Sequence, residues 1–227
     1  MDGCTSLHLA LKSGYSAIAR VLLERGANVH LRNKWDWTPM HFASRDGHAD
    51  VMQLLLDRGA DPNAQTDKQE IPLSLALKNK RVKAAQLLLE HCDNVDHRDE
   101  EGWTQLALAS SKGYYYIAQS LLDRGANADG QDMDGCTPLH LVSKSGRPAI
   151  ERVLLERGAS VDARNNKGCT PLHFASKDKH VEVVQLLLDR AADPNVQNDE
   201  KEIPLFIVLK VRAETAQMLL EHGADVY

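Results

Sequence analysis

The stretch TPLHLVSKSGRPAIERVLLERGA, residues 137–159, recurs in altered form along the whole chain. Its first four letters occupy a slot that returns every 33 residues, and the seven copies begin at Thr5, Thr38, Ile71, Thr104, Thr137, Thr170 and Ile203. Each copy leads into a short apolar segment, a turn often marked by Gly, and a second apolar segment such as VMQLLLDRGA, residues 51–60. The pattern predicts a helix, a turn and a second helix in every unit.

Two short helices have an apolar face too small to fold alone, so neighbouring units must stack and share a core. In the first unit we expect Leu7, Leu9, Val21 and Leu22 to be buried, together with their 33-residue equivalents. The TPLH, LLL and GA marks at these offsets resemble the ankyrin repeat over essentially the whole chain. The resemblance implies an all-α solenoid of helix-turn-helix repeats with short β-hairpin fingers.

We expect a single domain over residues 1–227, with repeats at 1–32, 33–65, 66–98, 99–131, 132–164, 165–197 and 198–227. A longer period of 132 residues is also present, because DGCTSLHLALKSG (2–14) aligns with DGCTPLHLVSKSG (134–146). This period indicates that a block of four repeats was duplicated, and it favours a segment of a longer array. The last repeat is one residue shorter between its helices, which predicts an altered turn there.

Helix ends are also readable in the repeat. Thr at the start of each slot can cap free backbone N–H groups, and Pro after it loses no hydrogen bond at the first helical position. The Gly of each GA pair suits a helix end with positive φ. Cys92 and Ala191 replace this Gly, at an expected cost of about 1 kcal/mol each, which predicts weaker third and sixth repeats.

Composition excludes several classes of protein. The 227 residues are 43% hydrophobic and 26% charged with a net charge of −5, which favours a globular, weakly acidic protein without a bias toward nucleic acid or membranes. Long apolar runs and a secretory leader are absent from the sequence. We therefore expect a monomer inside the cell, in the cytoplasm or nucleus.

The residue types that usually carry chemistry follow the repeat instead of forming sites. His8, His41, His140 and His173 share one slot, and slots of adjacent repeats lie about 8 to 10 Å apart, too far for a common zinc ion. The same spacing argues against a disulfide between Cys136 and Cys169. We predict structural histidines, reduced cysteines, no cofactor or metal, no small-molecule substrate and no enzymatic activity.

Tryptophan is confined to the segment before the slot, which in the ankyrin family forms a projecting finger beside a concave binding face. Trp35 and Trp37 are two residues apart, so on an extended finger they point the same way, and Trp103 is equivalent to Trp37. Exposed Trp resembles a binding hot spot. The alternative is that these rings pack on neighbouring fingers and stiffen them.

Basic residues form a second pattern near the end of each first helix, at Lys12, Arg45, Lys78, Lys144, Lys177 and Lys210, with Ser111 in the fourth repeat. If that face is open, the row attracts an acidic segment of a partner. The alternative is stabilisation of helix C-termini. Acidic finger residues can neutralise the row and oppose nucleic acid: Asp67, Glu70, Glu100, Glu101, Asp134, Glu200 and Glu202.

These patterns together predict a protein-protein interaction module that binds a partner protein or peptide along fingers and first helices. The candidate contact residues are Trp35, Trp37, Trp103, Arg45, Lys78, Lys144 and Lys177. The alternative is a structural spacer or regulatory array within a larger multidomain protein, with the activity carried elsewhere. The run Tyr114 to Tyr116 is expected to fill, with at least one ring, the slot that His48 and His180 occupy in other repeats.

Overall fold

The computed structural model describes residues 2–209 and 213–226. The regular secondary structure of these residues consists of α-helices, which follow one another in seven pairs. Their bounds are α1 (Ser6–Lys12), α2 (Ser16–Glu24), α3 (Pro39–Asp46), α4 (Ala49–Asp57), α5 (Pro72–Lys78), α6 (Val82–Leu89), α7 (Gln105–Lys112), α8 (Tyr115–Asp123), α9 (Pro138–Ser145), α10 (Pro148–Glu156), α11 (Pro171–Asp178), α12 (Val181–Asp189), α13 (Pro204–Leu209) and α14 (Ala213–Glu221). The predicted helix-turn-helix repeat is confirmed. The shortened turn predicted for the last repeat, and Lys210, lie outside the described residues.

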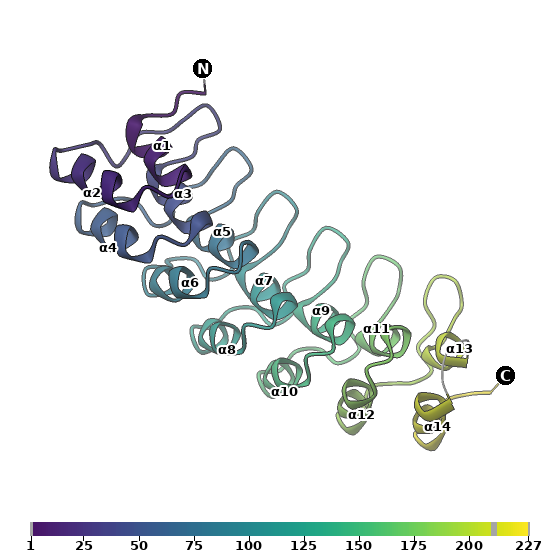
Figure 1. Cartoon of the computed structure of the whole chain (residues 1–227). Helices are drawn as coiled ribbons and strands as arrows, with labels where there is room; N and C mark the ends of the chain where they lie inside the picture. Colours follow the sequence, from purple (N-terminus) through teal and green to yellow (C-terminus); the bar gives the residue numbers. More distant parts are fainter. Residues whose placement is uncertain (1, 210–212, 227) are drawn as a thin grey trace. The chain divides into compact units, whose positions relative to one another are not determined.

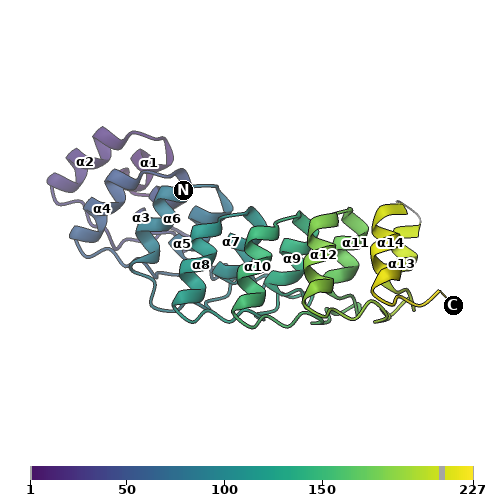
Figure 2. The same ribbon diagram turned by 90° about the horizontal axis from the view of Figure 1, so that it is seen from below.

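The helices fall into two groups, residues 1–101 and residues 102–227, and each group has the same construction. In the first group α1, α3 and α5 pack in an inner row, and α2, α4 and α6 pack in an outer row. In the second group α7, α9, α11 and α13 form the inner row, and α8, α10, α12 and α14 form the outer row (Figure 1). The connecting fingers of the second group lie at one end of these rows (Figure 2).

Buried histidines join consecutive repeats. The backbone N–H of Thr38 donates to His41 Nδ1 at 3.0 Å. His41 Nε2 lies 2.9 Å from the Ala64 carbonyl oxygen at the end of its own repeat and 3.3 Å from the Glu70 carbonyl oxygen of the next repeat. His140 and His173 reach the next repeat in the same way, at 3.0 Å from the Cys169 oxygen and 3.1 Å from the Glu202 oxygen. Burial lowers the pKa of His41 to about 4, so the ring is neutral and Nε2 donates. The predicted structural role of these histidines is confirmed.

The expected core of the first repeat is only partly correct. Leu7 is buried, whereas Leu9 and Val21 are each 52% exposed and Leu22 is half-buried. The equivalent of Leu9 in the second repeat, Phe42, is buried at 4% exposure, and its ring lies 5.5 Å from that of His8 in the preceding repeat. This slot therefore depends on a preceding helix pair for its burial, and periodicity alone does not show whether a given repeat has one.

Helix ends depart from the sequence prediction at one of the two replaced glycines. Ala191 adopts positive φ, at 61°, as the glycines at this position do. Cys92 does not adopt positive φ, because α6 ends at Leu89 and Glu90 caps it in the right-handed region at φ −65°. α6 is thus one residue shorter than α4. The left-handed strain predicted at Cys92 is wrong, and the strain predicted at Ala191 remains.

The fingers are tight turns, and the described residues form no extended β-strand. In the finger at residues 33–37, the Asn33 side chain accepts from the backbone N–H groups of Trp35 and Trp37, each at 3.0 Å. Asp36 takes positive φ, at 57°. The expectation that Trp35 and Trp37 lie on an extended segment is therefore wrong, because a left-handed residue separates them. Neighbouring fingers are joined by backbone hydrogen bonds, as from Asp67 N–H to the Trp35 oxygen at 3.2 Å.

One carboxylic acid lies inside the core. Glu151 of α10 is fully buried, Ser143 donates to its Oε1 at 2.9 Å, and Oε2 has no hydrogen-bond partner within the described residues. The other outer helices carry buried apolar residues at this position, namely Ala19, Met52, Ala85, Ala118 and Val184. Burial raises the pKa of Glu151 to about 8, so the side chain is protonated at neutral pH.

Replacing Ala191 with Gly is expected to raise the free energy of unfolding by about 1 kcal/mol, because Gly adopts positive φ without a Cβ clash. The matched change Cys92→Gly relieves no such strain and should give no gain. Urea denaturation of both variants measures the difference. Equal gains at both positions would contradict the assignment of strain to Ala191 alone.

Replacing Glu151 with Gln is expected to stabilise the protein increasingly as the pH rises from about 4.5 to 8. In this interval the folded state retains a proton that the unfolded state releases, so wild-type stability falls with rising pH. At pH 7 the difference is about 3 kcal/mol. Unfolding free energies across this range test the prediction, with Glu156→Gln on the exposed side of α10 as the control. Parallel profiles for wild type and E151Q would refute it.

Candidate functional site

Two positions of each repeat lie next to one another where the finger meets the inner helix. The finger-base slot is the residue before each Thr or Ile of the repeat: Cys4, Trp37, Glu70, Trp103, Cys136, Cys169 and Glu202. The cation column is the position near the end of the inner helix: Lys12, Arg45, Lys78, Ser111, Lys144 and Lys177 within the described residues. The side chains at the two positions meet in the second and third repeats, although the chain separates them by eight residues.

In the second repeat the two positions form an aromatic-cation stack. The Trp37 ring packs 4.9 Å from the Phe42 ring, and Arg45 Cζ lies 5.3 Å from the Trp37 ring. Arg45 also donates two hydrogen bonds to Asp46, at 3.1 and 2.6 Å. Trp37 is half-buried by these contacts. The alternative that the rings serve packing therefore applies to Trp37, and Arg45 already has a counter-ion.

Trp35 has a different environment at the tip of the same finger. Its side chain is 39% exposed, and Lys34 Nζ lies 4.3 Å from the ring. No ring contact between Trp35 and Trp37 occurs in the described structure. Trp103 precedes α7 in the second group and is half-buried. Trp35 and Trp37 are thus separate rings, and Trp35 is the most exposed of the three tryptophans.

In the third repeat the cation is neutralised by two acids. Lys78 Nζ lies 2.8 Å from Glu70 Oε1 and 2.9 Å from Asp99 Oδ2, and the Asp99 side chain is only 1% exposed. Burial acts to lower the pKa of Lys78, but the two carboxylates outweigh it and raise the pKa above its ordinary value. Of the acidic finger residues, Glu100 pairs instead with Lys68, at 2.9 Å. Predicted neutralisation of the row therefore occurs here, within the protein.

In the fifth and sixth repeats the cations remain exposed. No ion pair among the described residues involves Lys144 or Lys177. Their finger-base slots hold Cys136 and Cys169, both thiols without a disulfide. The seven candidate residues therefore fall into four groups: the packed pair Trp37 and Arg45, the ion-paired Lys78, the exposed Lys144 and Lys177, and the separate rings Trp35 and Trp103.

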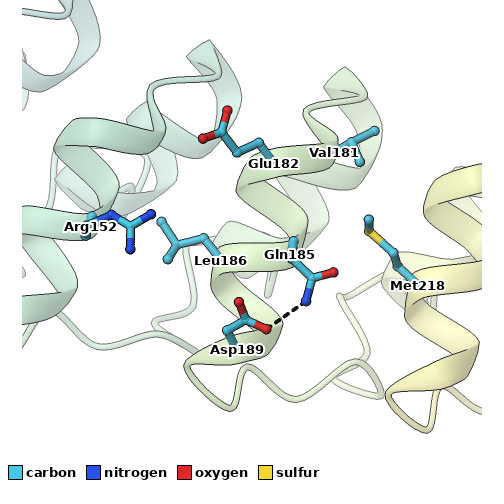
Figure 3. A pocket seen from close by; sticks show the side chains of 7 residues that line it. All are labelled: Arg152, Val181, Glu182, Gln185, Leu186, Asp189 and Met218. Carbon is cyan, nitrogen blue, oxygen red and sulfur yellow. Dashed lines mark hydrogen bonds between the residues drawn. The ribbon is translucent and has the colours of Figure 1, made fainter.

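A groove on the outer helices was not expected from the sequence. It has a volume of about 470 Å³ and runs across α10, α12 and α14, and Figure 3 shows its lining side chains: Arg152, Val181, Glu182, Gln185, Leu186, Asp189 and Met218. Gln185 donates to Asp189 at 2.7 Å (Figure 3). In the equivalent place of the first group, Arg20 and Asp50 form an ion pair at 2.5 Å between α2 and α4. A comparison of the residues at exposed positions of the second helix, one repeat against the next, is the sequence observation that could have indicated this groove.

Two further exposed side chains, those of Met133 and Tyr116, are not among the contact residues predicted from the sequence. Met133, at the tip of the fifth finger, is 72% exposed, and it is the one apolar residue among the described equivalents Lys34, Asp67, Glu100, Asn166 and Asp199. Tyr116 on α8 is 78% exposed. Tyr114 precedes α8 as His48 and His180 precede α4 and α12, and it is half-buried. Its position is the predicted one, and filling of the slot by its ring stays a prediction.

Metal-ligating side chains are not clustered in the part of the chain that the structure describes. Clusters of three or more His, Cys, Asp or Glu side chains that could hold a metal ion do not occur there. Over the same residues, every helix is too short or too polar to cross a membrane. The grouped polar features are the finger-base slot and the cation column.

Comparison with known proteins identifies the repeat. A family model described as "Ankyrin repeats (3 copies)" matches residues 1–66, 61–132 and 125–198. The solved ankyrin repeat domain of human ASB11 superposes with a TM-score of 0.85 at 27% identity, over 99% of this chain and 100% of that one. The ankyrin repeat domain of Bcl-3, titled a unique member of the IkappaB protein family, gives 0.77 at 26% identity, over 97% and 100%. Comparison with the curated proteins gave no match.

Replacing Lys78 with Met is expected to lower the free energy of unfolding by about 2 to 3 kcal/mol, because the buried Asp99 carboxylate loses its counter-ion. The same change at Lys144 removes an exposed charge and should alter stability by less than about 0.5 kcal/mol. Thermal or urea unfolding of K78M and K144M measures both values. Equal stability of the two variants would show that the Lys78 ion pairs are not structural.

Proposed function

The chain belongs to the ankyrin repeat family, whose domains are in general protein-interaction modules, and we propose that it binds a partner protein or peptide along its fingers and inner helices. The proposal describes a monomer inside the cell, in the cytoplasm or nucleus, that acts by binding and not by catalysis. Its partner contacts are assigned to the finger tips, the finger-base slot and the cation column.

The observation that supports this face is the contrast between buried and partly exposed positions. The histidine slot is buried in each of the first six repeats, whether it holds His, Ser or Ala, whereas the finger-base slot is half-buried except at Cys136. The finger-base slot, a few residues away, holds Trp, Glu or Cys. A stack of repeats needs the first set for folding and leaves the second set free to match a ligand.

Trp35 is the proposed anchor of the first group. Its backbone is held by the Asn33 side chain at 3.0 Å and by Asp67 of the next finger at 3.2 Å, so little freedom is lost when a ligand covers the ring. Lys34 over the ring adds a positive charge beside an apolar surface. Trp37 and Trp103 are proposed as supporting contacts from the finger base.

The test is a peptide-display selection against the chain, followed by affinity measurement for the selected peptides. We expect Trp35→Ala to weaken binding by about 30-fold or more, which corresponds to the 2 kcal/mol typical of an aromatic hot spot. Trp37→Ala and Trp103→Ala should weaken it to a smaller extent. Circular dichroism verifies that each variant is folded.

Tyr116→Ala is the matched control, since it removes an exposed aromatic ring from an outer helix and should leave affinity within about twofold. If the peptides bind W35A, W37A and W103A as tightly as wild type, the assigned face is incorrect. If no peptide is selected at all, the alternative of a spacer or regulatory array within a larger protein gains support.

A further inference from the structure

Each side chain of the cation column has two neighbouring positions that can hold its counter-ion. One is the finger-base slot of its own repeat, and the other is the turn residue that opens the next finger. In the third repeat both are acids, Glu70 and Asp99, and they bind Lys78 Nζ at 2.8 and 2.9 Å. In the third repeat these two residues therefore keep the cation of the column from a ligand.

In the fifth and sixth repeats the same two positions are uncharged. The Asn165 amide donates to Cys136 Sγ at 3.5 Å, and the Asn198 amide lies 3.8 Å from Cys169 Sγ. Burial raises the pKa of both thiols, so neither sulfur supplies a negative charge at neutral pH. In each of these repeats the Asn and Cys side chains therefore contact each other, and neither supplies a counter-ion to the lysine of the column.

Lys144 and Lys177 are accordingly exposed cations on adjacent inner helices, α9 and α11, which pack directly on one another. His180 Nε2 lies 3.0 Å from the backbone oxygen of Lys144. This contact holds the end of α9 and does not involve the Lys144 ammonium group. The helix dipole favours a cation at this place, but it leaves the N–H donors of the ammonium group to water or a ligand.

We infer that Lys144 and Lys177 receive the carboxylates of an extended acidic peptide segment of the partner, while Arg45 and Lys78 do not contact it through charge. This assignment rests on the proposed binding function and specifies which repeats take the acidic part of the ligand. Packed helices lie about 8 to 10 Å apart. A peptide in the polyproline II conformation rises about 3.1 Å per residue with three residues per turn, so carboxylates three residues apart lie about 9 Å apart on the same side of the peptide.

A peptide fits this surface better than a nucleic acid. Acidic side chains flank the two lysines, with Asp178 next to Lys177 in the chain and Glu202 at the finger base of the following repeat. Evenly spaced phosphates would meet these acids as well as the lysines. A peptide can place uncharged or basic residues opposite the acids and carboxylates opposite the lysines.

The test uses a synthetic 12-residue peptide with Asp at every third position among Ser and Ala, and a composition-matched peptide with its Asp residues adjacent. Calorimetric or anisotropy titrations at low and high salt give the affinities. We expect the spaced peptide to bind more tightly, with an affinity that falls as salt increases. Lys144→Gln with Lys177→Gln should weaken it by about tenfold, whereas Lys83→Gln, which removes an exposed cation from the outer helix α6, should change it by less than about twofold.

A second variant removes no cation. Cys136→Glu with Asn165→Asp reproduces around Lys144 the acids that hold Lys78, and it should weaken the spaced peptide although both lysines remain. Unchanged binding by K144Q/K177Q, absence of binding by the spaced peptide, or tighter binding of a single-stranded oligonucleotide would each overturn the inference. If display-selected peptides still depend on Trp35 in that case, the proposed function stands without it.

Discussion

The hydrogen bond from a buried histidine to the next repeat, made by His41, His140 and His173, is the interaction that links consecutive repeats of the array. Nδ1 accepts from the backbone N–H of the Thr at the start of its own inner helix, and Nε2 donates to a carbonyl of the following finger, as in the 3.0 Å and 3.3 Å contacts of His41 with Thr38 and Glu70. One neutral ring thus caps a helix, orients a finger and joins two repeats. Because burial holds its pKa near 4, the ring does this without a charge in the core.

This use of the histidines determines which residues remain for function. Positions buried in the stack must keep a side chain that packs there, as Ser74 and Ala107 do in the histidine slot, whereas most positions at the finger base and helix end are partly exposed to a ligand. The same column therefore contains a stacked Arg45, an ion-paired Lys78 and an exposed Lys144, and the residues at the neighbouring positions differ in the three repeats. Local ion pairing, more than the number of basic residues, sets the charge that a partner meets.

The period of the sequence predicted the helices, their order and the structural role of the histidines, because these follow from spacing and from local capping chemistry. The exposure of Leu9 and Val21 was not predictable from the period, since the period does not show that the first repeat lacks a preceding helix pair in this structure. The turn between Trp35 and Trp37 depends on the Asn33 side chain and on positive φ at Asp36. Positive φ is uncommon for residues other than Gly, so the sequence around Asp36 does not predict this turn. The ion pair between Lys78 and Asp99 joins residues twenty-one positions apart in the chain, so it is found only from the structure.

The central claim is that a partner binds across the fingers and inner helices and not on the outer helices. Hydrogen exchange of the chain with and without a display-selected peptide tests it most directly. The account predicts slower exchange in the finger at residues 33–37 and around the ends of α9 and α11, with the outer helices unchanged. Protection confined to α10, α12 and α14, around the groove in Figure 3, would contradict it.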